Sequence, residues 1–189
     1  MTAALTRRRL GGAVLLLAGI VVAAIVLWPS GRAKAPPLPE RLPFRIVSVP
    51  PLGLGFAYPR SWDRSVQGQV ITLSSRDQST LVIFSSPLAR PARERVKDEA
   101  QRALRKRFAP AEVVRESPGT IGNRSAASFE LRGRDRSGAV RALVLVSSTP
   151  YRTYAVTILT GARPSAQGLR EARQILGTVR FSRPLRSRR

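Results

Sequence analysis

Three acidic residues, Glu94, Asp98 and Glu99, lie close enough in the sequence to form a carboxylate cluster. Such a cluster could bind a metal ion or supply a general acid. However, its segment has apolar residues at every fourth position, which predicts a helix, and basic residues alternate with the acids. Arg95 and Glu99 form an i,i+4 pair on that helix. We therefore expect a solvated, charge-paired helix face here and no catalytic site.

The chain has no histidine and no cysteine. This composition excludes Ser-His-Asp hydrolysis, zinc hydrolysis, thiolate metal sites and disulfides. The stretch Gly53-Leu54-Gly55 is too short for a phosphate-binding loop. Asp135 and Gly138 lack the other oxygen ligands of a calcium loop and indicate a hairpin instead. We expect no catalytic residue, no metal site and no cofactor, and hence no enzyme.

Four aromatic residues could stack on a sugar ring or a base: Tyr58, Trp62, Tyr151 and Tyr154. Aromatic residues make up only 6% of the chain, and large aromatic side chains usually pack in cores. We therefore expect these four to pack in the core and along its edges.

Basic residues greatly outnumber acidic ones, 33 to 11, which gives a formal net charge of +22. One interpretation is attraction to anionic lipid, an acidic wall polymer, nucleic acid or an acidic protein. The other is a coding bias that spreads arginine over every exposed surface. The basic tail, residues 183–189, provides the candidate contacts with anionic headgroups, which are Arg183, Arg186, Arg188 and Arg189.

Residues 10–28 form an uncharged, apolar stretch of nineteen residues, long enough to cross a bilayer as a helix. The membrane-spanning residues include Leu10, Leu17, Ile20, Val26 and Trp28. Residues 1–9 end in three arginines, which favours a cytoplasmic N-terminus and places the rest of the chain outside the cytoplasm, in a single-pass protein of the cell membrane.

The apolar stretch could also be a cleaved signal peptide, because Ala33-Lys34-Ala35 resembles a cleavage site. Its length and the following Pro36 favour retention as an anchor. Residues 29–43 are rich in proline and predict an extended, semi-rigid linker.

Residues 44–182 alternate strand-like and helical segments. Strands are predicted over 45–49, 54–58, 69–73, 80–84, 112–117, 125–132, 139–148, 153–160 and 178–181. Helices are predicted from Pro91 to Phe108 and from Ser165, as N-cap, to Gly177. Turns are predicted at Pro118-Gly119 and Gly122-Asn123. Because short turns imply antiparallel pairing, the pattern predicts an α+β domain with an antiparallel β-sheet flanked by helices.

The order of the predicted elements, together with a few short motifs, also resembles that of a known fold. The phrase Gly55-Phe56-Ala57-Tyr58-Pro59 with Trp62 is followed by a hairpin, a helix with Ala100 and Leu104, strands around Phe129 and Tyr154, and a closing Ala172, Ile175, Leu176 and Phe181. This order resembles the PsbP/Mog1-like fold, which has small exported or membrane-anchored bacterial members. The resemblance implies an α/β/α sandwich and a role in binding other components, as PsbP assists photosystem II and Mog1 binds a small GTPase. It assigns no site residue.

The sequence thus leads us to expect a membrane-anchored, extracytoplasmic binding or assembly module for another envelope protein, presented along a sheet edge or a helix-free face. One alternative is a domain that binds polyanions or anionic lipid surfaces. Another is a secreted binding protein, if the N-terminal segment is cleaved. Nucleic acid is not an expected partner because the domain lies outside the cytoplasm, and the oligomeric state stays open.

N-terminal sequencing of the protein from the membrane fraction tests the anchor. We expect the mature chain to retain residues 10–28, because the span is longer than a typical signal-peptide core and Pro36 should hinder a peptidase. A mature chain that begins at Pro36 would contradict the anchor.

Overall fold

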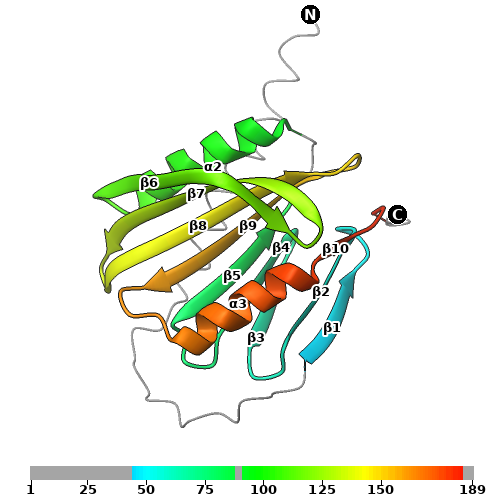
Figure 1. The fold of residues 1–189 in the computed structure, drawn as a ribbon, viewed down its shortest axis with the longest axis horizontal. Helices are drawn as coiled ribbons and strands as arrows, with labels where there is room; N and C mark the ends of the chain where they lie inside the picture. Colours follow the sequence, from blue (N-terminus) through cyan, green and yellow to red (C-terminus); the bar gives the residue numbers. More distant parts are fainter. Residues whose placement is uncertain (1–43, 88–90, 185–189) are drawn as a thin grey trace, which may run out of the picture.

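The computed structural model describes residues 44–87 and 91–184, which form ten strands and two helices (Figure 1). In chain order these are β1 (Phe44–Val49), β2 (Leu54–Pro59), β3 (Asp63–Gln67), β4 (Val70–Ser74), β5 (Thr80–Ser85), α2 (Arg93–Arg107), β6 (Ala111–Ile121), β7 (Arg124–Asp135), β8 (Gly138–Ser148), β9 (Thr153–Gly161), α3 (Ala166–Thr178) and β10 (Arg180–Phe181).

Some of the expectations lie outside the described residues: the membrane span 10–28, the linker 29–43, and Arg186, Arg188 and Arg189 of the tail. Among the helices of the described ranges, none is long and apolar enough to cross a membrane.

The strands form two antiparallel sheets, which confirms the α+β class and corrects the expectation of one sheet. The large sheet has the order β3-β4-β5-β9-β8-β7-β6, and the small sheet has the order β1-β2-β10. The chain turns sharply after β2, where the amide of Trp62 donates to the carbonyl of Pro59. This turn separates β2 from β3, so β2 pairs with β1 and β10 instead of extending the large sheet.

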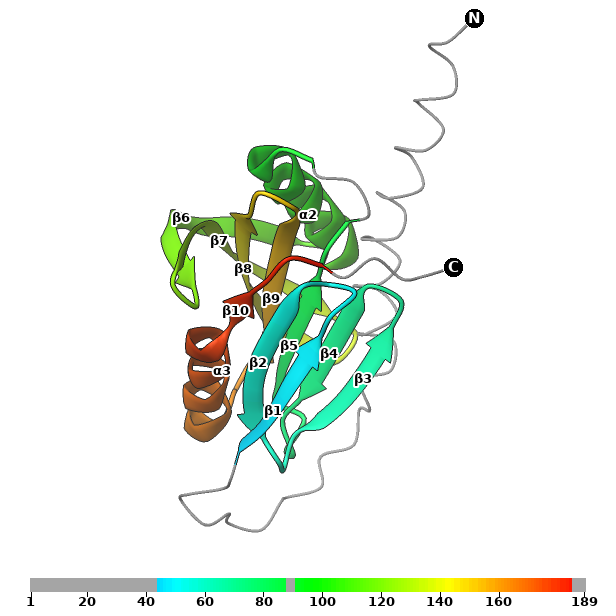
Figure 2. The ribbon, with the colours of Figure 1, turned by 90° about the vertical axis from the view of Figure 1, so that its right-hand side faces the viewer.

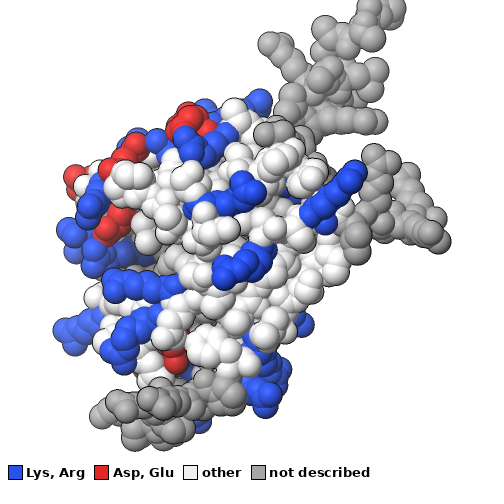
Figure 3. Space-filling model, turned by 45° about the vertical axis from the view of Figure 1, so that its right-hand side comes forward, with Lys and Arg blue, Asp and Glu red and all other residues white. Residues whose placement is uncertain are grey.

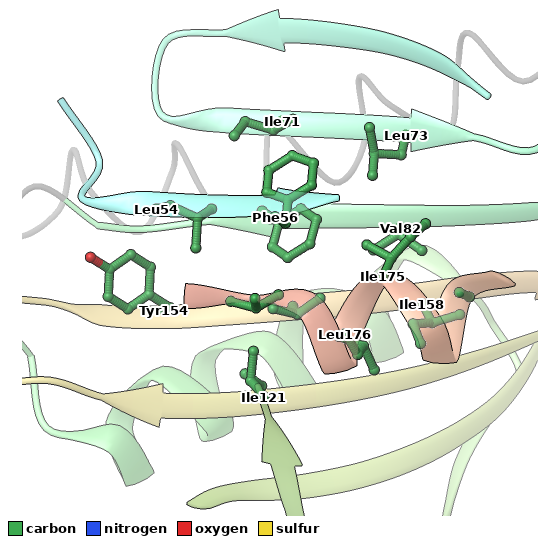
Figure 4. Close-up of a cluster of buried hydrophobic side chains, with 14 of the residues drawn as sticks. Leu54, Phe56, Ile71, Leu73, Val82, Ile121, Tyr154, Ile158, Ile175 and Leu176 are labelled. Carbon is green, nitrogen blue, oxygen red and sulfur yellow. The ribbon is translucent and has the colours of Figure 1, made fainter. Parts of the chain in front are cut away.

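The large sheet is buried on both faces, as the alternation of side chains along β9 demonstrates. Tyr154, Val156 and Ile158 point into a first core, whereas Ala155 and Leu159 point into a second core. The first core lies between the large sheet, the small sheet and α3 (Figure 4). The second core lies between the large sheet and α2. Each helix thus covers one face of the large sheet.

Both helices have the predicted apolar face. In α2 the side chains of Val96 and Leu104 are fully buried, as is Phe108 directly after it. In α3 Ala172 and Ile175 are fully buried in the first core. Ser165 caps α3 as predicted: its hydroxyl accepts a hydrogen bond from the amide of Gly168.

Two local predictions were wrong. Pro118-Gly119 is not a turn but lies within β6, an edge strand, where a missing proline amide is tolerated. Strand β3 was not predicted because its sequence, Asp-Arg-Ser-Val-Gln, is mostly polar and has no buried residue. It forms because its backbone pairs with β4 at the edge of the large sheet. The turn at Gly122 and the hairpin at Asp135 to Gly138 are confirmed.

The turn between β1 and β2 is joined to the C-terminal segment through Gly53. The amide of Ser182 donates to the carbonyl of Gly53, and the hydroxyl of Tyr154 donates to the carbonyl of Leu52 at 2.6 Å. Gly53 has a φ of +63°, and a Cβ placed there would lie 2.3 Å from the carbonyl oxygen of Ser182. Only glycine fits this position, both because of its backbone conformation and because of the close approach.

The substitution Gly53→Ala should destabilise the domain more than Gly68→Ala. Gly68 also has a positive φ, +58°, but a Cβ there would meet no atom within 4 Å. Both variants should lose about 1 kcal/mol through the left-handed backbone, and Gly53→Ala should lose roughly 1–3 kcal/mol more through the clash with Ser182. Urea unfolding of the two variants measures the difference. Equal losses would contradict the tight joint.

Candidate functional site

Two of the three acidic residues of the predicted charged helix, Glu94 and Glu99, form ion pairs on the surface. Arg95 and Glu99 pair at 3.0 Å, as predicted, and the ammonium of Lys97 lies 2.9 Å from Glu116 and 3.6 Å from Glu94. The hydrogen bond from Lys97 is the main reason why the pKa of Glu116 is lowered. Exposed pairs of this kind contribute little stability. Across residues 44–87 and 91–184, no three Asp or Glu side chains come together in a way that could hold a metal ion.

A second acidic residue, Asp77, belongs to a hydrogen-bonded turn between β4 and β5. Its carboxylate accepts hydrogen bonds from the hydroxyl of Ser75 and from the amide and hydroxyl of Ser79. Burial alone would raise the pKa of Asp77, but these bonds, with a further one from Ser165, outweigh it and lower the pKa. The hydroxyl oxygen of Ser79 also accepts a hydrogen bond from the amide of Ser165. The cluster therefore fastens this hairpin to the first turn of α3, which is a structural role.

Three of the four aromatic candidates are core residues, as expected. Tyr58, Trp62 and Tyr154 are each at most 3% exposed. The indole of Trp62 donates to the carboxylate of Glu171 on α3 at 2.6 Å. The ring of Tyr154 packs against Phe181, and burial raises the pKa of its hydroxyl. These rings are not available for a ligand.

Tyr151 differs from the other three because half of its side chain is exposed. It lies in the turn between β8 and β9, where the hydroxyl of Thr149 accepts hydrogen bonds from the amides of Tyr151 and Arg152. The guanidinium of Arg183 lies over the Tyr151 ring, 5.8 Å from its centroid. The side chain of Arg152 donates to Gln69. We call Tyr151, Arg152 and Arg183 the Tyr151 corner.

Of the four arginines proposed for the tail, Arg183 is the one within the described residues, and it contributes to this corner. Its position was not predictable, because the sequence does not tell which turn lies beside the C-terminus. The corner has the chemistry of a site for anions: a guanidinium group lies over an aromatic ring, and a second arginine, Arg152, follows that ring in the turn.

The charges are unevenly distributed over the domain. Every ion pair within the described part of the chain uses a carboxylate of α2, β6 or β7. In Figure 3 the acidic side chains gather mainly at the upper left, whereas Lys and Arg side chains occur over much of the visible face. The part of this visible face away from the acidic side chains is therefore predominantly basic.

The second candidate surface is the β1 edge, which we define as the exposed side of β1 that carries Phe44 and Ile46. The side chain of Ile46 is 88% exposed and that of Phe44 39% exposed. Val47, which points to the opposite face of β1, packs against the first core. Among the described strands β1 has only β2 as a neighbour, so no described strand pairs with the backbone amides and carbonyls on its other side.

Sequence reasoning predicted the strand but missed this surface. Ile46 stands between an arginine and Val47 in a segment with apolar residues of both parities, at positions 44, 46, 47 and 49. Such a pattern cannot tell which face is buried. The tertiary structure decides the question, because Val47 and Val49 pack on the core and Ile46 does not.

The comparisons with known proteins are informative for structure alone. No protein-family model matches the chain, and no curated protein matches it in sequence. A crystal structure of a protein from Bacteroides thetaiotaomicron is similar to it with a TM-score of 0.55 and 13% sequence identity, over 73% of this chain and 48% of that one. This chain thus spans about half the length of that protein.

Two further solved structures are similar. The cyanobacterial PsbP (CyanoP) of Synechocystis has a TM-score of 0.53 and 14% identity, over 80% of this chain and 99% of that protein. LpqN of Mycobacterium tuberculosis, which is described as involved in cell envelope biogenesis, has a TM-score of 0.51 and 11% identity, over 69% of this chain and 83% of LpqN. Identities this low speak for the fold and not for a shared activity. The chain therefore has the PsbP/Mog1-like fold that its order of elements resembles.

Proposed function

We propose that this protein is an extracytoplasmic binding module that engages another protein of the cell envelope and carries out no catalysis. Residues 10–28 hold it in the membrane, residues 1–9 remain in the cytoplasm, and the proline-rich linker 29–43 separates the domain from the bilayer. The length and hydrophobicity of residues 10–28 support the anchor, and the three arginines before them support this orientation.

The observation that carries the binding role is the exposure of Ile46 on the β1 edge. A large apolar side chain that is 88% exposed loses the gain of about 1.5–3 kcal/mol that full burial would provide. Its neighbour Phe44 on the same face is also exposed. Two such side chains beside a backbone edge that no described strand pairs with are typical of a surface that a partner covers.

The fold is a second, weaker support. LpqN has a similar fold and is described as involved in cell envelope biogenesis. At 11% identity this does not transfer a partner, but it gives a precedent for the fold in an envelope role.

Site-specific photo-crosslinking in intact cells tests the proposal. With a photoreactive amino acid in place of Ile46, we expect one discrete crosslinked product, because a bound partner must lie within reach of this position. Mass spectrometry of the product should identify an envelope protein. A photoreactive residue at Val66, an exposed apolar position on β3, is the matched control and should give no such product. Absence of a product from position 46, or a cytosolic protein in it, would contradict the proposal.

The second candidate function is binding to an anionic lipid surface or polyanion, and the Tyr151 corner favours it specifically. Arg152 and Arg183 have no carboxylate partner within the described part of the chain, and Tyr151 provides an amphipathic ring beside them. Exposed guanidinium and tyrosine side chains together are suited to an interface between water and headgroups.

Liposome co-sedimentation of the chain without residues 1–28 tests this second candidate. Binding to vesicles rich in phosphatidylglycerol should fall steeply as salt rises, because the attraction is electrostatic and screened. Replacing both Tyr151 and Arg183 by alanine should weaken binding several-fold, because a basic residue near anionic headgroups contributes about 1 kcal/mol to binding. The control Arg76→Ala, at an exposed position in the turn between β4 and β5, should have a smaller effect. Binding that does not respond to salt would contradict it.

A further inference from the structure

The two sheets end in four edge strands, and three of them are protected against pairing with another chain. Strand β6 has a bulge between Val113 and Arg115 and a proline, Pro118, that lacks an amide hydrogen. Strand β10 is only two residues long. Strand β3 begins with two charged residues, Asp63 and Arg64. Short length, charge, proline and bulges are the usual means by which proteins keep sheet edges from pairing.

Strand β1 lacks most of these protections. It is six residues long and pairs with β2 in a continuous register from Phe44 to Val49, without a bulge. It has no proline and one charged residue, Arg45. The side chains on its outer face include the most exposed large apolar residue of the described chain, Ile46. Of the four edges, β1 is therefore the one that accepts a further strand most readily.

The β1 edge is also held in place before any partner arrives. Val47 and Val49 are partly buried against the first core, and the turn after β1 is fixed by the joint at Gly53. Figure 2 shows β1 as the outermost strand of the small sheet, beside β2. A strand that pairs with a fixed edge needs to order only itself, which lowers the entropic cost of binding.

The charges near β1 indicate which segment fits. Within β1, β2 and the turn between them the only charged side chain is Arg45, and the cationic Arg60 follows β2 directly; the next acid along the chain, Asp63, begins β3. Arg60 follows Pro59, the residue that pairs with Phe44, so both arginines belong to the same end of the small sheet. An incoming strand with acidic side chains would meet complementary charge there.

The same charges make other occupants less suitable. A second copy of the chain would bring its own basic surface to the edge and be repelled. The preceding segment of this chain has prolines at positions 36, 37, 39 and 43, which cannot donate the amide hydrogen bonds of a ladder.

We infer that β1 binds an extended, acidic segment of the partner protein, which adds to the small sheet as a strand next to β1. The apolar side chains of this segment cover Phe44 and Ile46, and its acidic side chains lie toward Arg45 and Arg60. This inference rests on the proposed function and specifies the chemistry of the partner.

Peptide binding to the full-length protein in mild detergent tests the inference by fluorescence anisotropy. The probe is a labelled decapeptide of alternating valine and glutamate, and the charge control alternates valine and lysine. We expect the glutamate peptide to bind at least about tenfold more tightly. Two further versions of the glutamate peptide carry methyl groups on backbone nitrogens. One version is methylated at every valine, and the other at every glutamate. At least one of them should lose about tenfold in affinity, because it cannot donate to β1.

The protein variants are Ile46→Asp and, as a matched control, Val66→Asp on the β3 edge. Ile46→Asp should lower the affinity for the glutamate peptide about tenfold or more, and Val66→Asp should leave this affinity unchanged. Because both residues are exposed, neither variant should lose its fold, which thermal unfolding by circular dichroism checks.

Several results would overturn the inference. Equal binding of the lysine peptide would refute the acidic partner, and full binding of both N-methylated peptides would refute strand addition. A third outcome is that no peptide binds, whereas the full-length protein in detergent binds anionic vesicles and loses this binding in the Ile46→Asp variant. That outcome would mean that β1 contacts lipid. If no peptide binds while position 46 still crosslinks to an envelope protein, the proposed function stands and the acidic strand does not.

Discussion

Burial of the large sheet on both faces is the constraint on which the rest of this structure depends. Strand β9 is buried along almost its whole length, with alternate residues in two different cores. One core requires α2, and the other requires α3 together with the small sheet. Because apolar burial is the dominant favourable term in folding, neither helix can leave without exposing one face of the sheet.

This double covering limits where the molecule can bind anything. Within the described chain neither face of the large sheet is free of a helix, since each face carries one. Outside these covered faces lie the sheet edges, the outer face of the small sheet and the turns at the strand ends. The β1 edge is a surface of the first kind, and the Tyr151 corner is one of the third kind.

The small sheet links these two surfaces. Strand β1 ends at the turn that holds Gly53, and Gly53 accepts a hydrogen bond from Ser182, next to Arg183 of the Tyr151 corner. Tyr154 fixes the same turn through its hydroxyl. A change at this joint would thus affect both candidate surfaces, and a fixed joint keeps both in place before a partner binds.

The sequence by itself determined the local elements and the class of fold. Apolar periodicity placed both helices, Ser165 marked the start of α3, and alternating apolar residues with turn signals placed most strands. These features depend on residues a few positions apart, so they can be read without the fold. The exception is β3, a polar strand that exists because β4 lies beside it. The absence of histidine and cysteine likewise excluded whole classes of chemistry from composition alone.

Only the tertiary structure decided how the strands divide into two sheets, which strand lies at an edge, and which side chains remain exposed there. Ile46 and Val47 are both β-branched and apolar, yet one is exposed and the other packs on the core. Arg183 lies over Tyr151 although the two are far apart in the chain. Both outcomes result from contacts between distant segments, and the packing of the whole domain selects those contacts, which no local pattern records.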